Sequence, residues 1–360
     1  MKRFVLIFFT AIFCICAARA FAEIPAAANL PTQKDFLHKL FLFEGITCAE
    51  AYPKVGLKNE KLDERVSDFL WKASAHATEQ PDSRFLEELE RQGRLLYLDG
   101  CDDPMMQFMY ARLLLEMHND VAAAQFFRWA AQSLGKQGYA PVWQAQAASQ
   151  ARKIFDGVGD KDQAQKFDPL IIDAVHAMLK SALYDNSNRD LLIAQITSII
   201  EPLPALTRRT LWESIKDDRA IDPVALLMIE GFYEYSAAYE FHAGEADFPH
   251  ADHLALAGDS FFRAWQLDES LPDAAVAMLR LAAPDDSRTW LERATTARFD
   301  DPQAYSAYMS KLTNMADHKA LLEFGQECFD TARFDTEVPL IYLQTKIAAR
   351  DEIDSGDISD

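Results

Sequence analysis

Apolar residues recur every three or four positions along most of the chain, which is the period of an amphipathic α-helix. One predicted helix carries Val66, Phe69, Leu70 and Ala73 at i, i+3, i+4 and i+7, so that all four share one face. Glycine and proline are few, at 13 and 15 of 360 residues. The pattern predicts an all-α protein.

Cap residues and prolines mark where the predicted helices begin and end. Residues 32–35 (T-Q-K-D) resemble a capping box, and the helix that follows is expected to stop at Gly45. Asp103-Pro104 is expected to open another helix. A long helix is predicted to start at Pro223 and to end at Gly244.

One turn recurs three times in the C-terminal part of the chain. Each copy has an apolar residue, an aspartate and a nearby proline: Leu267-Asp268 with Pro272, Phe299-Asp300 with Pro302, and Phe334-Asp335 with Pro339. The aspartates lie 32 and 35 residues apart, close to the ~34-residue period of tetratricopeptide units. This spacing predicts a tetratricopeptide-like solenoid of antiparallel helix pairs.

The last ~140 residues also resemble a family of bacterial tetratricopeptide-like proteins of unknown function. Phe262–Asp268 and Leu271–Ala275 match the general tetratricopeptide pattern of alanine, leucine-aspartate turn and proline. The stretches that resemble the bacterial family more specifically are Trp290–Ala297, Ala304-Tyr305, Phe324-Gly325, Cys328, Thr331, Arg333–Thr336 and Val338-Pro339. Asn314–Asp317 stands where that family has a turn rich in tryptophan and glycine, so no role of that turn carries over. The resemblance implies a fold and no activity.

The sequence divides into five predicted regions. Residues 1–22 form a signal peptide, and residues 351–360 form an acidic tail. Between them we predict an N-terminal helical region (23–157), a middle helical region (158–221) and the tetratricopeptide-like repeats (222–350). The glycine-rich segment around residue 157 is the expected hinge between the first two helical regions.

The start of the chain has the three parts of a secretory signal peptide. Two basic residues precede an apolar run over residues 4–18, and an A-x-A site ends at Ala22, with Ala18-Arg19-Ala20 as the alternative site. The run of about 15 residues is shorter than the ~20 needed to cross a bilayer. The sequence therefore predicts export to the periplasm or the extracellular medium, with no integral membrane segment after cleavage.

The net charge of -20 argues against binding to nucleic acid, which rewards clusters of lysine and arginine. Beyond the signal peptide the cysteines are Cys48, Cys101 and Cys328. In an oxidising compartment Cys48 and Cys101 are candidates for a disulfide, because both fall near predicted helix ends. Cys328 lies in an apolar helical stretch and is expected to be a buried thiol.

No nucleophile elbow, phosphate-binding loop, dinucleotide fingerprint or paired-cysteine zinc motif occurs in the sequence. No catalytic or cofactor-binding residue is therefore assigned. His242, His250 and His253 lie among three acidic residues, and imidazole with carboxylate suits Zn²⁺. Two of these acidic residues, Glu245 and Asp252, serve equally well as helix caps.

Aromatic residues of the helix that starts at Pro223 are candidates for lining a groove, with Phe232, Tyr235 and Tyr239 as its residues. Packing in the core is the competing interpretation. Because helical solenoids bind other macromolecules along extended surfaces, we expect the chain to be a protein-binding or scaffold module rather than an enzyme. The alternative is a metal-binding protein or an enzyme that uses the three histidines.

Overall fold

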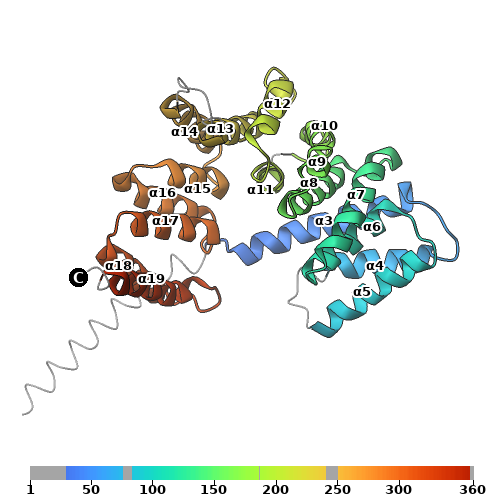
Figure 1. Ribbon diagram of the computed structural model, residues 1–360, viewed down its shortest axis with the longest axis horizontal. Helices are drawn as coiled ribbons and strands as arrows, with labels where there is room; N and C mark the ends of the chain where they lie inside the picture. Colours follow the sequence, from blue (N-terminus) through green and yellow to red (C-terminus); the bar gives the residue numbers. More distant parts are fainter. Residues whose placement is uncertain (1–29, 76–82, 186, 241–249, 357–360) are drawn as a thin grey trace, which may run out of the picture. The chain divides into compact units, whose positions relative to one another are not determined.

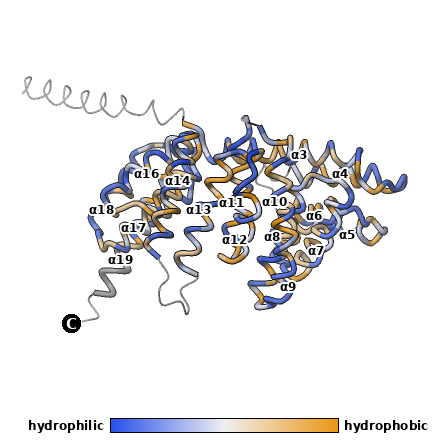
Figure 2. The backbone as a smooth tube through the Cα atoms, turned by 90° about the horizontal axis from the view of Figure 1, so that it is seen from above, coloured by the Kyte–Doolittle hydropathy of each residue, from blue (hydrophilic) through white to orange (hydrophobic). Residues whose placement is uncertain are grey.

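The computed structural model describes residues 30–75, 83–185, 187–240 and 250–356 (Figure 1). Within these ranges the chain is helical and contains no β-strand, which confirms the prediction of an all-α protein. Figure 2 shows hydrophobic and hydrophilic residues side by side along the helices, as amphipathic helices require. In the same ranges, none of the helices combines the length and the apolar character that a membrane crossing requires.

The chain forms two compact units. The large unit is Phe36–Leu267, and the terminal unit joins Met1–Asp35 to Asp268–Asp360. The predicted middle region (158–221) thus lies wholly inside the large unit. The predicted repeats (222–350) begin in the large unit and continue in the terminal unit.

Helices that follow one another in the large unit pack side by side, most extensively α13 with α14, α6 with α7, and α7 with α8 (Figure 1). The helices are α3 (Gln33–Val55), α4 (Asp63–Ala75), α5 (Ser83–Leu98), α6 (Pro104–Glu116), α7 (Asp120–Gln137), α8 (Pro141–Gly157), α9 (Lys161–Gln165), α10 (Asp168–Leu179), α11 (Arg189–Ile200), α12 (Ala205–Ile215), α13 (Pro223–Glu240) and α14 (His250–Leu267). Helix α3 begins in the terminal unit and continues into the large unit.

Small and aromatic residues let these helices approach closely. One stripe of α7, with Ala123, Phe127, Ala130 and Leu134, is fully buried. Between α13 and α14, a Cβ atom at Gly231 would lie 2.5 Å from the ring of Phe261. The ring therefore packs directly on the backbone of α13.

The terminal unit contains α15 (Pro272–Leu281), α16 (Pro284–Ala297), α17 (Pro302–Asn314), α18 (His318–Asp330), the 3₁₀-helix η2 (Val338–Leu340) and α19 (Ile341–Gly356). The prolines of the recurring turn stand where predicted, because Pro272 and Pro302 open α15 and α17. The aspartates of the turn have different partners. Asp268 bonds within its own turn, whereas Asp300 accepts a hydrogen bond from the backbone N–H of Gln33.

One predicted helix end is wrong, and a second lies outside the residues that the structure describes. The first helix does not stop at Gly45, because α3 runs on to Val55. Gly45 is buried against Ser74 of α4, where a Cβ atom at Gly45 would lie 3.2 Å from the Ser74 Cβ, so tertiary packing outweighs the low helix propensity of glycine. The other end, predicted at Gly244, lies outside the described residues.

All three described cysteines are buried free thiols, so no disulfide joins Cys48 to Cys101. Burial raises the pKa of the Cys48 and Cys328 thiols to about 12. Such thiols stay protonated at neutral pH and are poor nucleophiles. The expectation that Cys328 is a buried thiol is confirmed.

Helices α18 and α19 are packed so closely that Gly325 leaves no room for a side chain. A Cβ atom there would lie 1.9 Å from the Thr345 Oγ1, and Thr345 is fully buried. We expect Gly325→Ala to lower the free energy of unfolding by about 1–3 kcal/mol through overpacking. Denaturant unfolding followed by circular dichroism measures the loss.

Gly258 of α14 provides the matched control for Gly325→Ala. It also lies inside a helix, but a Cβ atom there would have no neighbour within 4 Å. Gly258→Ala should therefore raise the free energy of unfolding by about 0.5–1 kcal/mol. Combining Gly325→Ala with Thr345→Ala should recover most of the loss. An equal response of both glycines to alanine would contradict the close packing of α18 on α19.

Candidate functional site

A buried carboxylate lies at the centre of a polar cluster in the large unit. Glu44 of α3 is only 6% exposed. Its Oε2 accepts a hydrogen bond of 3.2 Å from the Arg112 guanidinium, and its Oε1 accepts bonds of 3.2 and 3.3 Å from the Gln146 and Gln195 amides. The three donors come from three different helices, α6, α8 and α11. Side chains distant in sequence thus converge on one negative charge.

An aromatic contact extends this cluster toward the start of α3. Tyr184 donates its hydroxyl hydrogen bond to the Gln195 Oε1, and its ring lies 5.6 Å from that of Phe43. Burial raises the pKa of Tyr184, and the nearby charge of Glu44 raises it further. Tyr184 is therefore a neutral donor at physiological pH. It orients the Gln195 amide toward Glu44.

The first half of α3 is held more loosely than the second half. No residue from Gln33 to Phe43 is fully buried, whereas Cys48 and Tyr52 are 0% and 2% exposed. Lys39 pairs with Asp190 at 2.7 Å and donates to the backbone carbonyl of Ser187 at 3.1 Å. Both partners of this ion pair are partly exposed, so its contribution to stability is small.

We call the surface that receives the first half of α3 the α3-contacting face. It consists of Arg112, Gln146, Tyr184, Asp190 and Gln195. It offers a cation and two amides for an acidic side chain, an aromatic ring for an apolar side chain, and one carboxylate for a basic side chain. This donor set can recognise a polypeptide, because charge-assisted hydrogen bonds give both strength and orientation.

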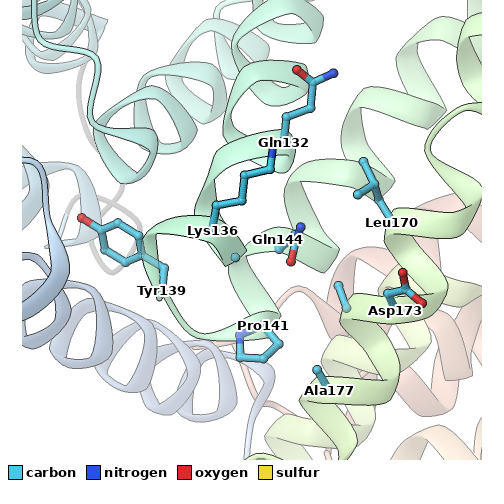
Figure 3. Close-up of a pocket in the computed structure, with 10 residues that line it drawn as sticks. Gln132, Lys136, Tyr139, Pro141, Gln144, Leu170, Asp173 and Ala177 are labelled. Carbon is cyan, nitrogen blue, oxygen red and sulfur yellow. The ribbon is translucent and has the colours of Figure 1, made fainter.

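A second concave surface lies on α7, α8 and α10 (Figure 3). It is an open groove of about 530 Å³ lined by the apolar Pro141, Leu170 and Ala177. Lys136 and Asp173 bring opposite charges to it, and neither forms an ion pair within the described part of the chain. The groove therefore brings a cation and an anion beside an apolar floor.

A glycine shapes this groove. The Gln144 amide donates to the Ala131 carbonyl at 3.0 Å and crosses α7 where a Cβ atom at Gly135 would lie 2.5 Å from its Oε1. Any larger residue at Gly135 would push Gln144 out of this position. The side chain of Gln144 is thus fixed as part of the groove (Figure 3).

The structure places two of the three predicted metal ligands in hydrogen bonds with α13. The Nδ1 of His250 lies 2.6 Å from the Ala238 carbonyl, and the Nδ1 of His253 is bonded to the Glu234 carboxylate. His242 lies outside the described residues. Among the residues that the structure describes, no group of three histidine, cysteine, aspartate or glutamate side chains is arranged to hold a metal ion.

The predicted groove aromatics separate into two environments. Phe232 is buried and packs edge-to-face on Phe261, with 5.2 Å between ring centroids. Tyr235 and Tyr239 pack on each other at 5.1 Å, and Tyr239, which is 55% exposed, also meets the ring of His250 at 5.2 Å. The two tyrosines and His250 thus share one surface of the α13–α14 pair.

The sequence alone did not single out the cluster around Glu44. A search for chemistry concentrates on histidine, cysteine and known motifs, whereas this cluster is built from glutamate, arginine and glutamine. The one available signal was Glu44 itself. It is an acidic residue directly after Phe43 at the end of the largely apolar stretch 36–43, where burial requires a partner.

Comparisons with protein-family models and with curated proteins found no relative of this chain. No family model matches the chain, and no curated protein is detectably similar to it. The candidate sites therefore depend on the geometry of the described residues.

Proposed function

We propose that the chain is an exported helical-repeat protein that binds another protein, with its helix pairs forming a tetratricopeptide-like solenoid. The α3-contacting face carries this proposal. It holds a helix through side chains from α6, α8 and α11, as solenoids hold ligands through successive repeats. The signal-like first 22 residues support export. The acidic surface favours a protein partner over nucleic acid.

The cysteines and histidines considered as candidates, where the structure describes them, are held in the core or in hydrogen bonds. The thiols of Cys48 and Cys328 are buried and protonated at neutral pH. His253 is engaged by Glu234, and the His250 Nδ1 is engaged by a backbone carbonyl. The described histidine and cysteine side chains named here therefore act as packing or hydrogen-bonding groups.

Affinity capture of the tagged full chain from its native envelope tests the proposed function. After cross-linking, mass spectrometry should find specific proteins enriched at least tenfold over a tag-only control. Two surface variants map the contact, Tyr239→Ser on the α13–α14 surface and Lys136→Glu combined with Asp173→Lys in the groove. Recovery of the chain in the cytosolic fraction alone would contradict export, and an empty capture would contradict protein binding.

A further inference from the structure

We propose that the α3-contacting face is a docking site for a partner's helix, and that residues 36–44 of α3 occupy this site in the free protein. The partner helix would carry a basic residue, then a large apolar residue four positions later, and a glutamate directly after it. Lys39, Phe43 and Glu44 have this spacing in α3. The inference rests on the proposed function, because it names the partner chemistry of a protein-binding module.

The donors of the face are specific for a carboxylate. Arg112, Gln146 and Gln195 all direct N–H groups to the two oxygens of Glu44. Gln195 is 3% exposed and Arg112 is one-quarter exposed, so both need an acceptor where water has little access. A helix that replaced α3 would have to supply a carboxylate at the same place. Apolar residues there would leave these donors unsatisfied.

The other contacts of α3 set the spacing of the partner's side chains. Phe43 packs against Tyr184, and Lys39 pairs with Asp190 and bonds to the Ser187 carbonyl. Residues four apart lie on one face of a helix, so the basic and apolar residues of a partner would meet the same two groups. The face therefore selects both a sequence pattern and a helical conformation.

Residues 36–44 can leave the face while the rest of α3 stays in place. From Phe36 to Phe43 no side chain is fully buried, and Leu42 is 47% exposed. Glu44, at 6% exposed, is the buried side chain of this segment and has to leave its three donors. Gly45 follows Glu44 directly, and a glycine inside a helix weakens it because glycine gains most conformational freedom on unfolding. Cys48 and Tyr52 anchor the following turns in the core. The helix is thus weakest where its loosely held half meets its buried half.

A peptide of residues 34–47 of this chain is the probe, labelled for fluorescence anisotropy. Lys39→Glu combined with Phe43→Ser removes the ion pair and the aromatic contact that hold α3. We expect this full-length variant to bind the peptide at least tenfold more tightly than the wild-type chain does. His38→Ser combined with Leu42→Ser changes the exposed side of the same helix and should leave peptide binding at the wild-type level.

A second peptide, with Glu44→Lys, tests the carboxylate. It should bind the Lys39→Glu, Phe43→Ser variant at least tenfold more weakly than the original peptide. Equal binding of both peptides, or equal binding by wild type and variant, would overturn the inference. If envelope capture enriches a partner protein but the peptide does not bind, the proposed protein binding stands and this docking site is excluded.

Hydrogen exchange of the wild-type chain tests the same inference without a substitution. Amides of residues 38–43 should exchange at least tenfold faster than amides of residues 48–52, because the first half of α3 opens locally. Comparable exchange rates in the two halves would show that α3 opens only as a unit. That result would contradict the displacement of residues 36–44 by a partner helix. It would do so even if the Lys39→Glu, Phe43→Ser variant failed to fold.

Discussion

Asp103→Ala is expected to lower the free energy of unfolding by about 4 kcal/mol, through loss of a helix cap and of two further hydrogen bonds. Asp103 is fully buried and caps α6 by accepting from the backbone N–H groups of Met105 and Met106 at 2.9 and 3.2 Å. Its other oxygen accepts from the Leu57 N–H at 2.9 Å and from the Tyr139 hydroxyl at 3.0 Å. Truncation would take the acceptor from the Leu57 N–H and would leave the buried Tyr139 hydroxyl without a partner there.

Denaturant unfolding of two further variants separates these contributions. Tyr139→Phe removes one donor and should cost about 1 kcal/mol. Asp103→Asn keeps one acceptor oxygen for the cap, so its loss should fall between those of Tyr139→Phe and Asp103→Ala. A loss below about 1 kcal/mol for Asp103→Ala would show that water or a rearranged loop replaces the carboxylate.

The Asp103 carboxyl also makes stability depend on pH. Burial raises the pKa of Asp103 above its usual value of 3.8, more than the hydrogen bonds from Leu57 and Met106 lower it. The folded chain then holds this proton more tightly than the unfolded chain does. The contribution of Asp103 to the free energy of unfolding therefore falls as the pH rises from 3.8 through the raised pKa. Asp103→Asn does not titrate and should lack this fall.

The sequence predicted the local part of this arrangement and not the rest. An aspartate before a proline indicates a helix start, and α6 does begin at Pro104 with Asp103 as its cap. Leu57 and Tyr139 lie 46 and 36 residues away. Neither residue has a local pattern that points to Asp103. Contacts of this kind depend on the tertiary packing of α3, α6 and α7, which periodicity does not encode.

Gly45 shows that tertiary packing, which the sequence pattern does not reveal, also decides where a helix ends. Glycine is a common helix terminator, so the sequence favoured an end there. The residues beyond it, Cys48 and Tyr52, bury their side chains completely, and this burial continues the helix. A backbone position close to Ser74 also requires a small residue. Gly45 is present for packing, which a single sequence cannot distinguish from termination.

The candidate sites, too, could be predicted from the sequence only in part. Residue types with known chemistry drew attention to the histidines near residue 250, and the exposed Tyr239, with the partly buried Tyr235 packed on it, lies against His250. The α3-contacting face combines Arg112, Gln146 and Gln195, which are common residues on ordinary amphipathic helices. Their convergence on Glu44 arises from how α6, α8 and α11 pack. Only the structure could identify that cluster.

Glu44→Ala is expected to lower the free energy of unfolding by about 3 kcal/mol, because removing one partner of a buried ion pair leaves the other charge uncompensated. The Arg112 guanidinium would keep its charge in a site that is one-quarter exposed, and the Gln146 and Gln195 amides would each lose an acceptor. The partial exposure of Arg112 keeps the loss at the lower end of the range for buried pairs. Chemical denaturation followed at 222 nm measures it.

Glu50 on the same helix supplies the matched control for Glu44. Its contact with Lys54 spans 3.9 Å, and both side chains are mostly exposed, so Glu50→Ala should change the free energy of unfolding by less than about 0.5 kcal/mol. In a double-mutant cycle, Glu44→Ala with Arg112→Ala should cost clearly less than the two single losses added together. Additive losses would mean that Glu44 and Arg112 act independently. The convergence of donors would then be a consequence of packing, with no preference for a carboxylate on the α3-contacting face.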